Sequence, residues 1–333
     1  GIVLGTRSAV FTPFAKLGLI IVDEEHDISY KQQDGFRYSA RDLAVLRGQF
    51  EACSVVLGSA TPSLESFHNV KSKKYELLSL TKRAGNAKRE KYKLIDKRLL
   101  EVNAGFTISL KEQIANQLSS GHQVLVFLNR RGFAPVIICS SCKWIAQCSR
   151  CDARLTYHLK QNALICHHCG TMQHNVTRCQ SCASKDVTAL GLGTQRIEQT
   201  LKAAFPEIPI LRIDRDSTRR QGKMTDFIRE ISKGMPAILV GTQLLAKGHH
   251  FPNVTLVAML DIDASFYSSD YRALERLGQL ILQVGGRAGR ADQSGTVVIQ
   301  TEFVTHPLLR KLIDNGYWKF TNGNLQRKFT KGN

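Results

Sequence analysis

The sequence predicts an α/β protein with two parallel-sheet lobes and a cysteine-rich insertion in the second lobe. Three observations predict this class. Short apolar runs rich in Val, Ile and Leu alternate with helical patterns, an alternation that is typical of parallel α/β sheets. A basic, polar segment, Thr81–Lys93, separates two groups of such runs. Eight of the nine cysteines lie between Cys139 and Cys182, so this segment differs in kind from the rest.

Six apolar runs are the expected strands. Each run is continuous rather than alternating, so we expect strands that are buried on both faces. The strands are Leu17–Val22, Ser54–Leu57, Gln123–Leu128, Ala237–Val240, Val254–Leu260 and Thr296–Gln300. Periodic apolar positions between them predict helices over Gln195–Phe205, Met224–Ser232 and Ser268–Val284.

These elements divide the chain into six expected segments. They are the first lobe at residues 1–80, a linker at 81–106, the start of the second lobe at 107–138, the cysteine-rich insertion at 139–186, the rest of the second lobe at 187–305, and a C-terminal region or tail at 306–333.

The cysteines form four C-x-x-C pairs, which supply eight thiolates for two tetrahedral zinc ions. The inner four have the separation of a zinc ribbon: Cys148, Cys151, Cys166 and Cys169. The outer four then belong together: Cys139, Cys142, Cys179 and Cys182. Protein fills all four positions of each site, so the zinc is expected to be structural. Disulfides would need an oxidising compartment, which nothing in the sequence indicates.

The chain is strongly basic, with 46 Lys and Arg against 28 Asp and Glu and a net charge of +18. Two four-thiolate zinc sites would lower this charge to about +14. The excess favours a polyanionic partner such as nucleic acid over a generic basic surface. The sequence contains neither a membrane-spanning run nor a signal peptide pattern. We therefore expect a cytoplasmic protein without membrane association. It opens on an apolar run without Met, as expected of a piece of a longer chain.

Carboxylates follow the first expected strand, at Asp23, Glu24 and Glu25, with His26 beside them. Ligands bind at the carboxyl ends of strands in open α/β sheets. A nucleotide triphosphatase needs one carboxylate there for Mg²⁺ and a second to orient water. Asp23 suits the first role and Glu24 the second, although an acidic turn is the simpler alternative.

The run Ser54–Leu57 is followed by a similar turn. Gly58 permits the tight turn, and Ser59 and Thr61 can hydrogen-bond the carboxylates.

Two arginines close the last expected helix in QVGGRAGR. Arg287 and Arg290 are three residues apart, so a helical turn would aim them in one direction. Arginine suits the charge of a transferring phosphoryl group, whereas the alternative is a solvated basic loop. Thr242 follows another expected strand, and Lys247 lies in a loop suited to backbone phosphates.

The strings GTRSAVFTPF, VDEEHDISYKQQDGFRYSARDLAVLR, LGSATPSLES, FLNRRGFAP, FPEIPILRIDRD, GTQLLAKGHHFP and QVGGRAGRA, with the eight cysteines, resemble the PriA family of superfamily 2 replication-restart DNA helicases. The resemblance runs from near residue 1 to about residue 320. It implies two RecA-like lobes with ATP between them, 3′→5′ unwinding at stalled forks, and nested zinc sites.

The resemblance also implies roles for individual residues. ATP with Mg would be bound by Asp23, Glu24, His26, Gln283, Arg287 and Arg290. Coupling to DNA would involve Ser59, Thr61, Phe36, Arg37, Thr242 and Lys247. Phe36 stands where the family commonly has Trp. The implied partners are forked and single-stranded DNA, primosome proteins, single-strand binding protein and the replicative helicase loader.

The sequence departs from the family in one respect. No G-x-x-x-x-G-K-[ST] occurs, and the single Gly-Lys pair, Gly222–Lys223, lacks that context. This loop holds the β- and γ-phosphates, and the resemblance places it upstream of residue 1. We therefore expect no useful ATP hydrolysis from this chain alone. Two functions stay open: an ATP-dependent DNA helicase, or a truncated, ATPase-deficient zinc-containing module that binds DNA or primosome partners.

Overall fold

The computed structural model divides into two compact units, residues 1–79 with 317–333, and residues 80–316. It describes residues 1–32, 34–80, 90–98, 102–103, 105–129, 137–142, 144–151, 153–158, 161–166, 168–189, 194–213, 229–242, 251, 253–268, 270–289 and 294–317. Among these residues, no helix has both the length and the apolar character that a membrane span requires.

The first unit contains a two-stranded parallel sheet of β1 (Leu19–Val22) and β2 (Ser54–Leu57), in which Leu19 pairs with Ser54. Helix α1 (Ala40–Phe50) packs against both strands. Helix α2 (Leu64–Lys71) follows β2. Ser39 and Ser63 cap these helices by accepting hydrogen bonds from the backbone N–H groups of Asp42 and Ser66. Two short 3₁₀ turns complete the unit, η1 (Arg7–Phe11) and η2 (Ile28–Tyr30).

The expectation that these two strands are buried on both faces is wrong. Alternate side chains of a strand point to opposite faces. Val22 is buried, whereas Leu19 and Ile21 on the other face are 51% and 65% exposed. Val56 of β2 is also exposed. Helix α1 covers one face of the strand pair. The continuous apolar runs predict two buried faces, but in the described part of the unit the other face is exposed.

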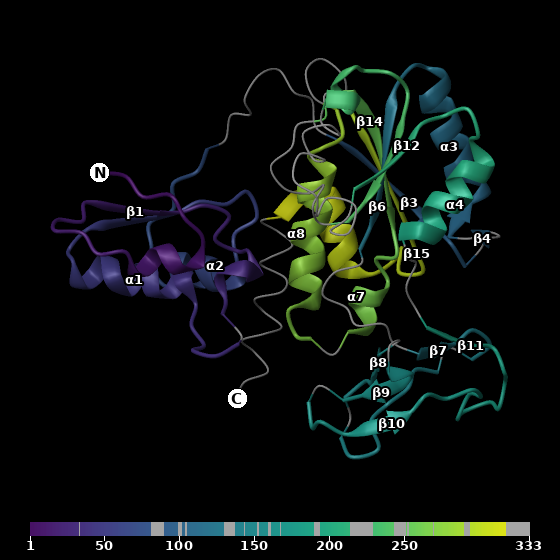
Figure 1. Cartoon of the computed structure of the whole chain (residues 1–333), viewed down its shortest axis with the longest axis horizontal. Coiled ribbons are helices and arrows are strands. Elements are labelled where there is room, and N and C mark those ends of the chain that lie inside the picture. The colour runs from purple at the N-terminus through teal and green to yellow at the C-terminus, as the bar shows by residue number, and fades with distance from the viewer. Residues whose placement is uncertain are drawn as a thin grey trace. The chain divides into compact units, whose positions relative to one another are not determined.

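The second unit is built on a six-stranded parallel sheet (Figure 1). The strand order is β12 (Ile210–Ile213), β13 (Ile238–Gly241), β6 (Gln123–Leu128), β14 (Val254–Leu260), β15 (Thr296–Thr301) and β3 (Lys91–Asp96). All six residues of β6 are buried, as are all of β13 and β14. The prediction of doubly buried strands is confirmed for these three.

Helices α3 (Ile108–Ser119) and α4 (Thr194–Ala204) cover the sheet. Their apolar residues join the main core, among them Leu110, Ile114, Ile197 and Leu201. The predicted helix Gln195–Phe205 is thus confirmed within one residue at each end. Of the predicted helix Met224–Ser232, residues 229–232 are helical and the rest lies outside the described residues.

The predicted helix Ser268–Val284 begins later than expected. The chain forms a short helix α7 (Ala264–Tyr267), and α8 begins only at Ala273 and ends at Gly285. The side chain of Asp270 accepts a hydrogen bond from the backbone N–H of Arg272. Such a local side-chain bond favours a turn over a helix, which explains the later start.

The expected linker at 81–106 is wrong in its second half. Strand β3 pairs in parallel with β15, with Lys91 opposite Thr296. A small ribbon of β4 (Val102–Asn103) and β5 (Phe106–Thr107) follows it. The other boundaries of the six segments stay a prediction.

The cysteine-rich module leaves the sheet after β6 (Figure 1). Its base is an antiparallel ribbon of β7 (Ile137–Cys139) and β11 (Val187–Ala189). Beyond it lies a three-stranded sheet of β8 (Thr156–His158), β9 (Ala163–Ile165) and β10 (Met172–His174). A separate small core forms around Ile137, Leu155, Leu164 and Cys166.

Strand β3 lies tightly against the end of α8. A Cβ added to Gly285 would overlap the hydroxyl of Tyr92 on β3. Gly285→Ala should therefore lower the free energy of unfolding of the second unit by about 1–3 kcal/mol, through overpacking. Urea unfolding followed by circular dichroism measures this loss.

Gly286→Ala is the matched control, because its Cβ would meet nothing closer than the Leu282 carbonyl oxygen at 3.4 Å. Adding Tyr92→Phe to Gly285→Ala should recover part of the loss. Equal urea midpoints for the two glycine variants would show that the contact is unimportant.

Candidate metal centres and carboxylate site

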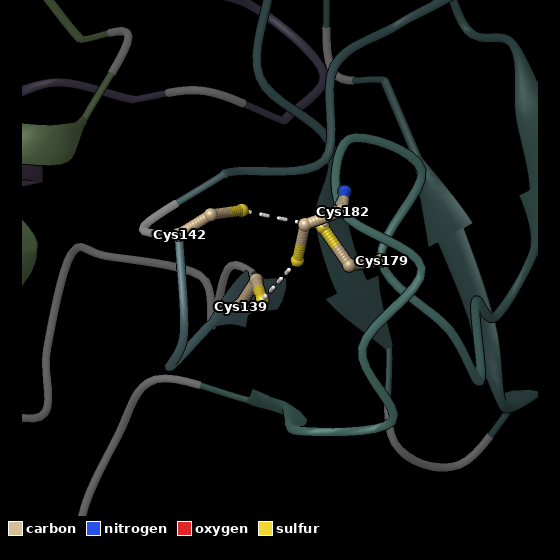
Figure 2. Close-up of side chains that lie close together, drawn as sticks. All are labelled: Cys139, Cys142, Cys179 and Cys182. Carbon is tan, nitrogen blue, oxygen red and sulfur yellow. Dashed lines mark hydrogen bonds between the residues drawn. The ribbon is translucent and has the colours of Figure 1, made fainter.

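The outer four cysteines converge at the base of the module. Cys139 ends β7, and Figure 2 shows its side chain with those of Cys142, Cys179 and Cys182 pointing toward one another. Their sulfur atoms all lie within 4.8 Å of one another. The Sγ atoms of Cys139 and Cys182 are 3.7 Å apart, and those of Cys142 and Cys179 are 3.5 Å apart.

The inner four cysteines form a second cluster of the same kind. The Sγ atoms of Cys148 and Cys169 are 3.5 Å apart, as are those of Cys151 and Cys166. All four sulfur atoms lie within 4.8 Å of one another. The structure therefore brings together the two nested sets that the spacing predicts.

Both clusters fit a tetrahedral zinc ion. Zn–S bonds of about 2.3 Å place the sulfur atoms of a tetrahedron about 3.8 Å apart, close to the separations above. A disulfide would need about 2.05 Å, and none of the nine cysteines forms one. Each cluster consists entirely of protein sulfur, so a zinc ion held there would be structural rather than catalytic.

The four C-x-x-C turns share one backbone hydrogen bond. The N–H of the first cysteine donates to the carbonyl oxygen five residues later: Cys139 to Trp144, Cys148 to Ala153, Cys166 to Thr171, and Cys179 to Ser184, at 2.8–2.9 Å. In the two turns where the structure describes the residue after the second cysteine, that residue is left-handed: Gly170 with φ 77° and Ala183 with φ 58°. The module thus repeats one local structure four times.

Backbone N–H groups in these turns favour the thiolate form. Those of Ser181 and Cys182 donate to the sulfur of Cys179 at 3.3 and 3.4 Å. The N–H of Cys142 lowers the pKa of the Cys139 thiol to about 6. The N–H of Ser184 likewise favours the Cys182 thiolate, but the neighbouring thiols raise the pKa of Cys182 to about 12. A bound dication would relieve this conflict, because it deprotonates coordinating thiols.

The carboxylates Asp23 and Glu24 lie in the turn that follows β1, and both are exposed. Asp23 Oδ1 accepts a hydrogen bond from the Glu24 N–H at 2.9 Å. A Cβ added to Gly58, beyond the neighbouring strand β2, would lie 3.6 Å from that oxygen. Glu24 adopts a left-handed φ of 48°, a conformation that costs a non-glycine residue about 1–2 kcal/mol. The turn therefore presents both carboxylates to solvent at the carboxyl end of the sheet.

His26 and Ser59 connect the turns that follow the two strands. The His26 Nδ1 lies 2.7 Å from the Ser59 hydroxyl oxygen and 3.5 Å from a Glu24 carboxylate oxygen. Ser59 Oγ also accepts a hydrogen bond from the Thr61 N–H at 2.9 Å. The hydrogen bond that the structure gives Ser59 on this segment is therefore to His26 rather than to the expected carboxylate. Thr61 is 2% exposed.

Glu25 has a role that the sequence did not indicate. Its carboxylate is 2% exposed and accepts hydrogen bonds from the N–H of Ser63 at 2.6 Å and the hydroxyl of Ser63 at 3.1 Å. Arg41 of α1 completes the network, with an Nη1 atom 3.2 Å from Glu25 and 2.8 Å from the Ser63 hydroxyl. One buried carboxylate therefore ties α1 to the N-terminus of α2.

The segment from Tyr30 to Tyr38, which carries Phe36 and Arg37, begins beside the carboxylate turn. The Tyr30 hydroxyl donates to the Asp23 carbonyl oxygen at 2.7 Å. Burial, and then the charges of Asp23 and Glu24, raise the pKa of Tyr30. Phe36 is 77% exposed, and its ring centroid lies 5.9 Å from that of Tyr38. Arg37 is exposed next to it.

In the second unit, Gln283 lies in α8 and Arg287 follows the end of that helix. The Arg287 N–H donates to the Val284 carbonyl oxygen at 3.0 Å. Gly289 then takes a left-handed φ of 66°, which breaks the helical path. Arg290 lies outside the described residues, so the expectation that one helical turn aims both arginines together stays a prediction. Thr242 is 6% exposed just beyond β13, and Lys247 lies outside the described residues.

Two family models match the chain. The PriA DNA helicase Cys-rich region domain matches residues 148–174, and the helicase conserved C-terminal domain matches residues 181–292. The replication restart protein PriA of Haemophilus influenzae is 53% identical over 331 residues, covering 99% of this chain and 45% of that protein. The chain belongs to the PriA family. Its six-stranded sheet is accordingly the RecA-like helicase C-terminal lobe, with the cysteine-rich module of PriA inserted after β6.

Other PriA proteins are also similar to this chain. Those of Bacillus subtilis and Chlamydia muridarum are 41% and 46% identical over 308 residues each. They cover 92% and 90% of this chain, and the chain covers 38% and 41% of them. The chain therefore spans less than half the length of these PriA relatives.

We predict two zinc ions per chain. Elemental analysis of protein purified without chelator should give two, and Cys151→Ser or Cys182→Ser should each lower the content to one, because each change removes one of four ligands from a single site. Cys53→Ser is the control and should retain both ions, since Cys53 belongs to neither cluster. Finding one zinc or none in the unchanged chain would contradict this prediction.

We predict that Glu25 stabilises the first unit and that Glu24 does not. Among the described residues, Glu25→Ala leaves the partly buried Arg41 with only Asp42 as an ion-pair partner, so it should cost about 2 kcal/mol of unfolding free energy. Glu24→Ala, at an exposed position, should cost less than about 0.5 kcal/mol. Hydrogen exchange of α2 amides measures both. Equal protection in the two variants would refute the role of the Glu25 network.

Proposed function

We propose that this chain carries the motor of an ATP-dependent 3′→5′ DNA helicase that acts in replication restart at stalled or recombined forks. One observation carries the proposal. In a chain of the PriA family, two exposed carboxylates follow one strand of a parallel pair, and His26 connects their turn to Ser59 after the other strand.

The carboxylate turn supports nucleotide hydrolysis by its chemistry. Exposed carboxylate oxygens are ligands that Mg²⁺ prefers, usually through retained waters. In the proposed mechanism Asp23 would hold the ion in this way, and the bound ion would supply positive charge to the phosphates. Glu24 orients the attacking water and accepts its proton. The hydrogen bond from the Glu24 N–H fixes one oxygen of Asp23 beside this group.

Two further sets of residues complete the proposed motor. Gln283, Arg287 and Arg290 supply hydrogen bonds and positive charge to the nucleotide, a role for which the guanidinium group is well suited. Ser59, Thr61, Phe36, Arg37, Thr242 and Lys247 couple the nucleotide to DNA. The exposed Phe36 ring has a free face on which a base can stack.

The module contributes structure rather than chemistry in this proposal. Its two sites hold structural zinc ions, and its ribbon returns the chain to the lobe. Forked and single-stranded DNA are the proposed nucleic acid partners. Primosome proteins, single-strand binding protein and the replicative helicase loader are the proposed protein partners, by analogy with the family.

A second function is favoured by one feature of the sequence. No G-x-x-x-x-G-K-[ST] loop occurs in these 333 residues, and that loop positions the phosphates in this class of enzyme. Without it the chain would be an ATPase-deficient, zinc-containing module that binds DNA or primosome partners.

We predict salt-dependent, sequence-tolerant binding to forked DNA under either function. Contacts to about six phosphates would weaken binding roughly a thousandfold between 50 and 200 mM salt. ATP hydrolysis then separates the two functions, when it is measured on the chain extended at its N-terminus by a segment that carries the Gly-Lys-Thr loop. Turnover that forked DNA stimulates and that Glu24→Gln lowers by at least about a hundredfold identifies the motor. DNA binding without hydrolysis identifies the binding module, and binding that ignores salt contradicts both. Glu76→Gln, a carboxylate change outside the site, is the control.

A further inference from the structure

Arg154 is a side chain of the cysteine-rich module that contacts the helicase lobe. It follows Cys151 of the inner cluster by three residues. Its guanidinium carbon lies 5.7 Å from the centre of the Tyr267 ring, which belongs to α7. Within the described part of the chain, the Arg154 guanidinium forms no hydrogen bond or ion pair and has this ring as its partner. A charge that is withdrawn from water needs a compensating interaction. For the Arg154 guanidinium, the Tyr267 ring has to provide it.

The surroundings of Tyr267 make its ring such a partner. Its hydroxyl donates to the Glu302 carboxylate at 3.5 Å. Burial, followed by the charges of Glu302 and Asp263, raises the pKa of Tyr267 to about 12, with Arg154 opposing the rise. The phenol is therefore neutral at ordinary pH. Asp263 is balanced by Lys97, whose Nζ lies 2.6 Å from it. Arg154 thus faces an aromatic ring in acidic surroundings, the arrangement that cation–π attraction favours.

The inner cysteine cluster sets the position of Arg154. The Cys148 N–H donates to the Ala153 carbonyl oxygen at 2.9 Å. Arg154 itself forms an isolated antiparallel bridge with Gln147, and the Leu155 N–H donates to the Ala146 carbonyl oxygen at 3.0 Å. The backbone that carries the arginine is therefore part of the turn that holds two inner cysteines.

We propose that Arg154 docks the cysteine-rich module on helix α7, and that the fold of the inner cysteine cluster is what aims it there. Helix α7 packs against α8, which ends at Gly285, two residues before Arg287. The docking point therefore lies next to the helix that leads to the arginine segment. This cation–π contact therefore holds the module against α7.

Hydrogen exchange of the whole chain, read across the contact, tests this. In the Arg154→Ala variant, exchange is measured in α7, where the backbone N–H groups of Ser265 and Phe266 donate to the carbonyl oxygens of Ile262 and Asp263. In Tyr267→Leu the readout is β8 of the module. Each change should raise exchange on the opposite side about fivefold. Tyr267→Phe keeps the ring and should match the unchanged chain. Arg150→Ala, an exposed arginine of the same turn, is the matched control.

Zinc content is measured in every variant and should stay at the value of the unchanged chain. Unaltered exchange in α7 for Arg154→Ala, or an equal rise for Arg150→Ala, overturns the proposal. Loss of zinc from Arg154→Ala also overturns it, because the arginine would then support the inner cluster rather than the docking. The double variant, Arg154→Ala with Tyr267→Leu, should exchange no faster than either single variant, because the two residues act through one contact.

Discussion

The complete burial of β6 is the constraint on which the second unit depends. Its backbone pairs with β13 on one side and β14 on the other, and none of its six residues reaches solvent. A strand in this position cannot shift by one residue without moving every side chain to the opposite face. The module that follows β6 therefore starts from a fixed point, and the β7–β11 ribbon pairs the two ends of the module with each other.

In the first unit, the buried carboxylate of Glu25 is the corresponding constraint. Asp23 and Glu24 are exposed and chemically available, but the turn that holds them is anchored by their neighbour Glu25. Three consecutive carboxylates thus divide into two that face solvent and one that is hydrogen-bonded inside the fold. Charge repulsion within such a run is tolerable because Arg41 neutralises the buried member.

The sequence predicts those features whose signal is local. Strands β2, β6 and β14 match their apolar runs residue for residue, and the cysteine spacing selects the two clusters. Strand β3 was missed because it is an edge strand with exposed Lys91 and Lys93, and so resembles a basic linker. Glu25 was missed because its partners Arg41 and Ser63 are distant in sequence. Nothing in the acidic run itself distinguishes the buried carboxylate from the exposed pair.

The nesting of the two cysteine clusters gives the module an order of assembly. The inner pair Cys151 and Cys166 is separated by 15 residues, whereas the outer pair Cys142 and Cys179 is separated by 37. Each doubling of the length of a loop adds about 0.6 kcal/mol to the entropic cost of closing it. Once the inner cluster has closed, only two short connections, residues 143–147 and 170–178, remain free between the outer pairs. Loop entropy therefore favours closing the inner cluster before the outer one.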